Sequence, residues 1–185
     1  MQMADSLRLT ELTLTIPRAD SDLDAVHAIY SNPGTWTHLP SGRHTDISQT
    51  RTKFDEWNES WNTHSLGPWI VRDTETNQVL GMVGCSVQRN AFWNLGYRLS
   101  PNAQGRGVAS RVAELAVRKA NETNPDLPVI AYLLEHNTAS AQVAQRIGLT
   151  LEDRCLDAGN PDPEAVRLIY SDRPLTQAQL EAARA

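Results

Sequence analysis

The sequence predicts an α/β (α+β) fold, with a mixed sheet that contains one clear βαβ unit. Apolar residues recur with period two in some segments and at helical spacing in others, which indicates both strands and helices. The expected order is β, α, α, β, β, β, α, β, α, β, β. Strands at residues 92–99 and 129–134 flank a long amphipathic helix at 107–121, and such a crossover is typical of a parallel pair.

The first half of the chain is expected to form one strand and two helices. Residues 9–16 alternate apolar and polar side chains and predict a half-buried strand. A short helix follows at residues 20–30, where Asp or Ser can cap it, and a second one at residues 45–61. Trp57 and Trp61 stand at helical spacing, which favours core packing over a wall of an acceptor pocket.

The second half reads as strands alternating with helices. Strands are expected at residues 68–71, 79–87, 92–99, 129–134, 149–151 and 166–171, and helices at 107–121 and 138–147. Residues 73–77 favour a hairpin turn, and Gly148 is placed as a C-cap. We expect a single domain over residues 7–174 and a C-terminal tail, residues 175–185, that could form a surface helix.

Composition excludes several classes of protein. The 185 residues are 40% hydrophobic, which predicts a packed core, and the net charge of −5 disfavours nucleic-acid binding. No stretch approaches about 20 apolar residues, so no membrane span is expected. The first residues lack the pattern of a secretory signal. Cys85 and Cys155 stand far apart without a CxxC motif and are expected to be reduced, packed thiols. A cytoplasmic protein without a metal is therefore expected.

The most informative segment is the loop between the strand at 92–99 and the helix at 107–121. Its small residues Gly105, Gly107 and Ala109 would let an anion approach the unpaired amides at the helix start. The loop is therefore a candidate phosphate cradle.

Three interpretations of this loop compete. A Walker loop is excluded, because Val108 and Ala109 stand where Lys and Ser or Thr are needed. A dinucleotide-binding fingerprint fits in part, since Glu135 stands where a ribose-binding acid would sit, but Ser110 replaces the third glycine. The third interpretation is a glycine-rich turn without a ligand.

Further motifs accompany the loop. They are Gln104-x-x-Gly107-x-Ala109, Asn137-Thr138-Ala139-Ser140, Gly148-Leu149 and the segment 66–71. Together they resemble the GNAT superfamily of N-acetyltransferases, and most of all the branch that contains the ribosomal-protein-alanine N-acetyltransferases. The resemblance runs from about residue 7 to residue 174. It implies a mostly antiparallel sheet of six to seven strands with a central parallel βαβ unit and helices on both faces.

The resemblance also implies a reaction and its site. Acetyl-CoA would be the co-substrate, without a metal, and the partner would be an amine acceptor, either a protein N-terminus or a small molecule; a homodimer is left open. The pyrophosphate would be held by the backbone of Gln104, Gly105, Arg106, Gly107, Val108 and Ala109. Leu99 would pair through its backbone with the pantetheine arm, and Asn137 would hydrogen-bond the same arm. Ser140 would protonate the departing thiolate.

Simpler roles and departures from the pattern accompany these assignments. Helix capping could explain both Asn137 and Ser140. The tyrosine that often follows the Asn by seven positions is Ala144 here, which makes Ser140 the candidate acid. Asn94 replaces a frequent Glu and cannot take a proton. An α-amino acceptor, with a pKa of about 7.7–8.0, is therefore favoured over a lysine at about 10.4.

Other candidates remain open at this point. The candidate bases are Glu135, His136, His44 and the acids around Asp153. His38 and His44 stand in the loop where acceptor sites usually lie, although exposed loop positions are the simpler interpretation. The missing carboxylate and tyrosine also suit a non-catalytic acyl-CoA-binding or regulatory domain, and a dinucleotide-binding protein is a further alternative.

Overall fold

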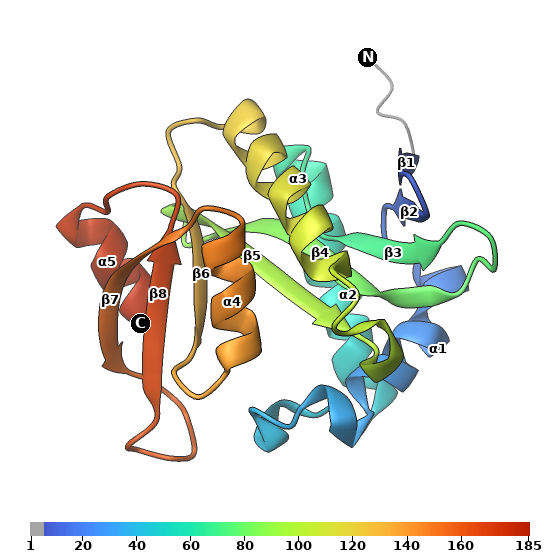
Figure 1. Ribbon diagram of the computed structural model, residues 1–185, viewed down its shortest axis with the longest axis horizontal. Coiled ribbons are helices and arrows are strands. Elements are labelled where there is room, and N and C mark those ends of the chain that lie inside the picture. The colour runs from blue at the N-terminus through green and yellow to red at the C-terminus, as the bar shows by residue number, and fades with distance from the viewer. Residues whose placement is uncertain (1–5) are drawn as a thin grey trace.

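A computed structural model describes residues 6–185, which contribute an eight-stranded sheet in the order β1-β2-β3-β4-β5-β6-β8-β7 (Figure 1). The strands are β1 (Ser6–Leu9), β2 (Leu12–Thr15), β3 (Trp69–Asp73), β4 (Val79–Gln88), β5 (Phe92–Leu99), β6 (Val129–Leu134), β7 (Thr150–Leu156) and β8 (Val166–Ser171). The α-helices are α1 (Ala19–Tyr30), α2 (Ile47–His64), α3 (Val108–Thr123), α4 (Thr138–Arg146) and α5 (Gln177–Arg184). The start of the chain, where no secretory signal is expected, lies outside the described residues up to residue 5.

The predicted fold class is confirmed. All neighbouring strands pair antiparallel except β5 and β6, which are parallel and joined by α3. Helices cover both faces of the sheet: α3 and α4 lie on one, and α1, α2 and α5 lie on the other (Figure 1). The sheet has eight strands rather than six to seven.

The additional strand comes from the N-terminal segment. The single strand expected over residues 9–16 is wrong, because the chain turns at Thr10 and Glu11 and pairs Leu9 with Leu12. Thr10 adopts the left-handed region, with φ 47°. The apolar spacing changes at this turn: Leu9 and Leu12 lie three positions apart, whereas Leu12, Leu14 and Ile16 alternate. The period-two interpretation of residues 9–16 overlooked this change.

The start of α1 also differs from the expectation. Arg18, and neither Asp20 nor Ser21, is the N-cap residue. The carboxylate of Asp22 accepts the Arg18 N–H at 2.8 Å and forms an ion pair with Arg72 of β3. An acid one turn into the helix therefore satisfies its first amide and ties it to the sheet.

Other helix ends follow the sequence signals. Asp46 and Gln49 form a capping box at the start of α2. Gly148, with φ 86°, follows the end of α4, where a left-handed residue turns the chain into β7. Trp57 and Trp61 are buried, as the core interpretation predicts.

The tail forms α5, a surface helix, as expected, and one side of it packs against the sheet. Ala183 of this helix is buried against a cluster formed by Phe92, Ile130 and Ile169. The Arg167 guanidinium donates to the Ala183 carbonyl at 2.7 Å. Both cysteines are free thiols, Cys85 buried and Cys155 partly so. Within residues 6–185, no helix is long and apolar enough to cross a membrane.

One feature of the sheet prepares the site. The parallel strands β5 and β6 pair only at Trp93 with Val129 and at Asn94 with Ile130. Beyond Asn94 no further residue pair joins the two strands, so the second half of β5 has no paired strand on its β6 side. Residues from the starts of α3 and α4 line a cavity at this end of β5.

Candidate active site

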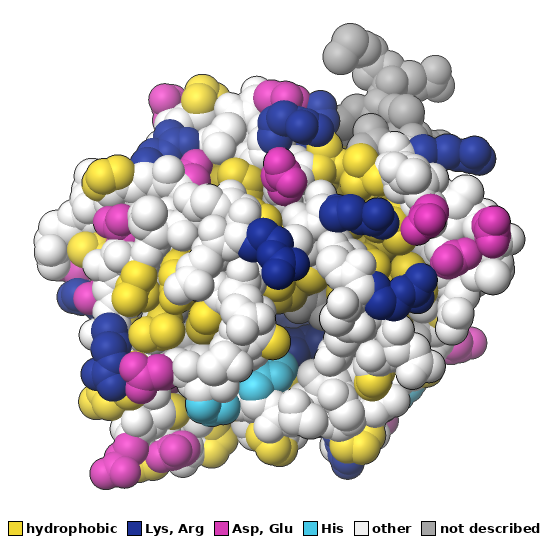
Figure 2. All heavy atoms as spheres, in the orientation of Figure 1, with side chains coloured by type: hydrophobic (Ala, Val, Ile, Leu, Met, Phe, Trp, Pro, Cys, Tyr) yellow, Lys and Arg dark blue, Asp and Glu magenta, His cyan; other side chains and the backbone are white. Residues whose placement is uncertain are grey.

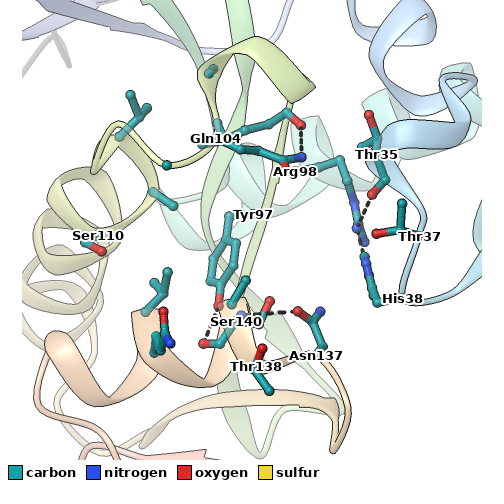
Figure 3. Close-up of a pocket in the computed structure, with 18 of the residues that line it drawn as sticks. Thr35, Thr37, His38, Tyr97, Arg98, Gln104, Ser110, Asn137, Thr138 and Ser140 are labelled. Carbon is teal, nitrogen blue, oxygen red and sulfur yellow. Dashed lines mark hydrogen bonds between the residues drawn. The ribbon is translucent and has the colours of Figure 1, made fainter.

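A cavity of about 550 Å³ lies at the end of β5 (Figure 3). Its walls come from the loop at residues 34–38, the end of β5, the turn into α3 and the turn into α4. The following predicted site residues line it: Leu99, Gln104, Gly105, Gly107, Val108, Ala109, Asn137 and Ser140. Segments far apart in the sequence therefore meet around one hollow, which Figure 2 shows bordered by histidine and basic side chains.

The turn into α3 presents backbone donors to this cavity. Gly105 and Gly107 have φ values of 72° and 74°, a conformation that glycine adopts without strain. The first helical bond runs from the Arg111 N–H to the Gly107 carbonyl at 3.1 Å. Among the described residues, none accepts a hydrogen bond from the amides of residues 105–110. A Cβ added at either glycine would meet nothing within 4 Å, so the space over these amides is open.

Side chains around the turn are placed less uniformly. The Gln104 amide group donates to the Leu99 carbonyl at 3.2 Å, which fixes it across the end of β5. Arg106 is exposed and is absent from the cavity wall as the structure describes it, whereas Arg146 of α4 belongs to that wall. The backbone of the turn, and not the Arg106 side chain, therefore faces the hollow.

The Leu99 backbone faces the opening between β5 and β6. Ser100 donates its N–H to Leu80, toward β4, whereas Trp93 donates its N–H to Pro128, toward β6. Because backbone groups alternate sides along an antiparallel strand, the Leu99 N–H points to the β6 side. The strands have diverged there, so this donor is available to a ligand.

The turn into α4 places Asn137 and Ser140 on the wall. Asn137 Oδ1 accepts the Ser140 N–H at 3.2 Å, so Asn137 caps the helix. The Asn137 amide nitrogen and the Ser140 hydroxyl have no partner among residues 6–185. Capping therefore uses Asn137 Oδ1 and the Ser140 N–H, and it leaves the Asn137 side-chain NH2 and the Ser140 hydroxyl free for a ligand.

Tyr97 is a wall residue that the sequence interpretation missed. Its side chain extends from β5 to α4, where the hydroxyl donates to the Ser140 carbonyl at 3.1 Å (Figure 3). Burial raises the pKa of Tyr97, so the phenol is neutral. Ala144, at the position where related sequences often have a tyrosine, is fully buried. The only sequence signal that could have placed Tyr97 on this wall is its position two residues before Leu99, which puts both side chains on the same face of β5.

Arg98 faces the opposite wall, which is formed by the loop at residues 34–38. Its guanidinium lies 3.8 Å from the centroid of the Trp36 ring, a cation–π contact. Nη1 donates to the Thr35 carbonyl at 3.4 Å and to His38 Nε2 at 3.0 Å (Figure 3). The sequence interpretation missed Arg98 and Thr35 as wall residues.

His38 is a neutral imidazole in this setting. Burial, and then the nearby positive charge of Arg98, lowers its pKa to about 4. Its Nε2 accepts the Arg98 hydrogen bond, so the ring proton is on Nδ1. His136 donates from Nε2 to the His38 carbonyl at 2.7 Å and also lines the cavity. His38 is therefore poorly suited to take a proton from an amine near neutral pH.

The other candidate bases lie away from the cavity. Glu135 is exposed and pairs with Arg154, and Asp153 pairs with Arg184. His44, expected to be an exposed loop residue, is buried and bonds the Thr50 hydroxyl at 2.8 Å. Among the described wall residues there is no Asp or Glu.

Comparison with known proteins identifies the fold and the family. The family model described as "Acetyltransferase (GNAT) domain" matches residues 11–150. A GNAT-family acetyltransferase from Bordetella pertussis superposes with a TM-score of 0.74 at 16% identity, covering 92% of this chain and 100% of that one. An acetyltransferase from Agrobacterium tumefaciens str. C58 gives 0.70 at 28% identity, covering 92% and 96%. RimL, a ribosomal L7/L12 alpha-N-protein acetyltransferase solved with coenzyme A, gives 0.73 at 20% identity, covering 90% and 96%.

Proposed function

The chain belongs to the GNAT acetyltransferase domain family, and from this premise we propose that it transfers an acetyl group from acetyl-CoA directly to a primary amine. The acceptor would be a protein N-terminus or a small molecule. The observation on which this depends is the row of unpaired amides at residues 105–110, open to a cavity that reaches Ser140. RimL, which shares the fold, acts on a protein α-amine and was solved with coenzyme A.

The turn into α3 would hold the pyrophosphate of the coenzyme. Amides at a helix start point outward and stand at the positive end of the helix dipole, which favours an anion. The positive φ of Gly105 and Gly107 gives the turn a shape that glycine adopts without strain, and the missing side chains would let phosphate oxygens come close to the amides. Val108 and Ala109 would contribute only their backbone.

The gap beside β5 would hold the pantetheine arm. The Leu99 N–H would donate to the arm or to the thioester oxygen, where negative charge develops during the reaction. The Asn137 amide nitrogen, which is not used in capping, would donate to a carbonyl of the arm. Binding would therefore complete hydrogen bonds that the diverging strands leave unmade.

Ser140 would act at the sulfur. The amine nitrogen attacks the thioester carbon, a C–N bond forms and the C–S bond breaks. The Ser140 hydroxyl would give its proton to the departing thiolate and recover one from the protonated nitrogen through solvent. The described wall carries no carboxylate, and His136 is the one candidate base named from the sequence that lines it. An acceptor that is easily deprotonated, such as an α-amino group, therefore suits the site better than a lysine.

A thiol-release assay with acetyl-CoA and a panel of amines tests this proposal. The panel comprises peptides with free N-termini, the same peptides with blocked N-termini, free amino acids and a lysine side-chain peptide. We expect thiol release that depends on a free amine and a product heavier by one acetyl group, measured by mass spectrometry. Binding of acetyl-CoA without transfer to any amine would indicate a non-catalytic binding domain.

A further inference from the structure

Arg98 has donors that the protein leaves unused. Nη1 makes both of its hydrogen bonds, while the edge formed by Nε and Nη2 has no partner within residues 6–185, and no described carboxylate pairs with this side chain. Arg72 and Arg167, which are also largely buried, each pair with an aspartate. The Nε–Nη2 edge of a guanidinium matches the two oxygens of a carboxylate. Arg98 therefore differs from these two arginines, because it lines the cavity without a carboxylate partner among the described residues.

A second observation concerns the way in which Arg98 is held on this wall. The Thr35 carbonyl and His38 Nε2 both accept hydrogen bonds from Nη1, and the Trp36 ring lies against the guanidinium. None of these three partners carries a negative charge, so the contacts fix the position of the cation and leave its charge without a counter-ion in the described part of the chain. The Thr35 hydroxyl is buried away from the cavity and takes no part in these contacts.

The charge of the cavity points the same way. Its described wall contains Arg98 and Arg146 but no acidic residue, although the whole chain has a net charge of −5. A simple cationic amine would find no counter-charge there. An amine that brings its own carboxylate would be attracted to the wall and held by it.

We propose that Arg98 forms a carboxylate subsite that selects amine acceptors bearing a carboxylate close to the reacting nitrogen. The Arg98 Nε–Nη2 edge binds the carboxylate, and the Thr35 carbonyl and the Trp36 ring hold the guanidinium in place. The carboxylate is either the main-chain group of a free amino acid or an acidic side chain beside a peptide N-terminus. This inference rests on the proposed acetyl transfer and specifies its acceptor.

Matched acceptor pairs test the subsite in the intact protein. One pair is L-alanine and L-alaninamide, which differ in the main-chain carboxylate and are compared at equal concentrations of unprotonated amine, because the carboxylate also raises the pKa of the amine. The other is alanyl-aspartyl-alanine amide and its asparagine counterpart, which differ in an acidic side chain. We expect kcat/KM to be roughly 10- to 100-fold higher for the acidic member of at least one pair, and which pair responds identifies the source of the carboxylate.

Variants then test whether the preference depends on Arg98. Arg98→Gln should reduce the acidic-to-neutral ratio to about one, and Arg98→Lys should restore part of it, because a lysine keeps the charge but not the fork. Arg43→Gln, at an exposed position outside the cavity, is the charge control and should keep the wild-type ratio. Acetyl-CoA affinity, measured by calorimetry, should stay within about twofold in all three.

The possible results separate the two proposals. If no amine in any pair is acetylated, the proposed function fails. If amines are acetylated but neither pair shows a preference in the wild type, the carboxylate subsite is wrong and the transfer stands. The same conclusion follows if a preference survives in folded Arg98→Gln protein.

Discussion

The two halves of the cavity are built in different ways. The half at the start of α3 uses backbone amides from one continuous stretch, residues 105–110, and its shape comes from two glycines. The half around Arg98 uses side chains from β5 and from the loop at residues 34–38. A site made of backbone can serve one invariant ligand group in many relatives, whereas a site made of side chains can change with the acceptor.

The largest effect is expected where the backbone half is blocked. Gly107→Glu places a side chain and a negative charge over the amides, so acetyl-CoA binding should fall below detection by calorimetry. Gly159→Glu is the matched control, because Gly159 also has a positive φ of 79° and open space but lies in the loop between β7 and β8. Normal coenzyme affinity in folded Gly107→Glu protein would refute the cradle.

Ser140→Ala tests whether turnover can be reduced without a change in coenzyme binding. Removing the hydroxyl should slow turnover roughly 100-fold, the scale of a lost general acid, while coenzyme affinity changes little. Kinetics with saturating acetyl-CoA, together with calorimetry, would separate the two quantities. Unchanged turnover would remove Ser140 from the mechanism.

Tyr97→Phe tests whether the link between β5 and α4 positions Ser140. The variant loses the hydrogen bond to the Ser140 carbonyl, which is worth about 1 kcal/mol, so turnover should fall a few-fold. Coenzyme affinity and KM for the amine should stay close to wild type. A loss larger than that of Ser140→Ala would instead make the Tyr97 phenol the proton donor.

The smallest effect is expected from pH on the side-chain half. The pKa of His38 falls from 6.5 to about 4 on folding, so between these pH values the unfolded chain binds more protons than the folded one. Stability should therefore rise with pH across this window and lose the contribution as pH falls through it. His38→Gln should flatten the dependence of the melting temperature between about pH 4 and 6.5. A variant with the wild-type slope would contradict this assignment.

The backbone half was predictable because its signals are local. Glycines at fixed spacing before an amphipathic helix specify an open helix start, and the crossover from β5 to β6 brings Asn137 and Ser140 to the same edge. Most elements were also predictable, since each has a clear apolar period. The turn at Thr10 was missed, although the spacing of three between Leu9 and Leu12 interrupts the period of two there.

The side-chain half was not predictable because its contacts are tertiary. Nothing in the sequence around Thr35 and Trp36 indicates that these two residues contact Arg98, which stands more than 60 positions later in the chain. His44 likewise has the sequence context of an exposed loop residue and is buried through contacts with Tyr30 and Thr50. Such contacts follow from the way α1, α2 and their connecting loop cover the sheet.

The short seam between β5 and β6 has a mechanical consequence. Only two residue pairs join the strands there, so the block formed by β6, β8 and β7 is fastened to the remainder of the sheet along a narrow strip. A ligand bound between β5 and β6 would contact both parts of the sheet and restrict their relative motion. Ligand binding should therefore slow the hydrogen exchange of backbone amides in both parts together, including in strands that do not contact the ligand.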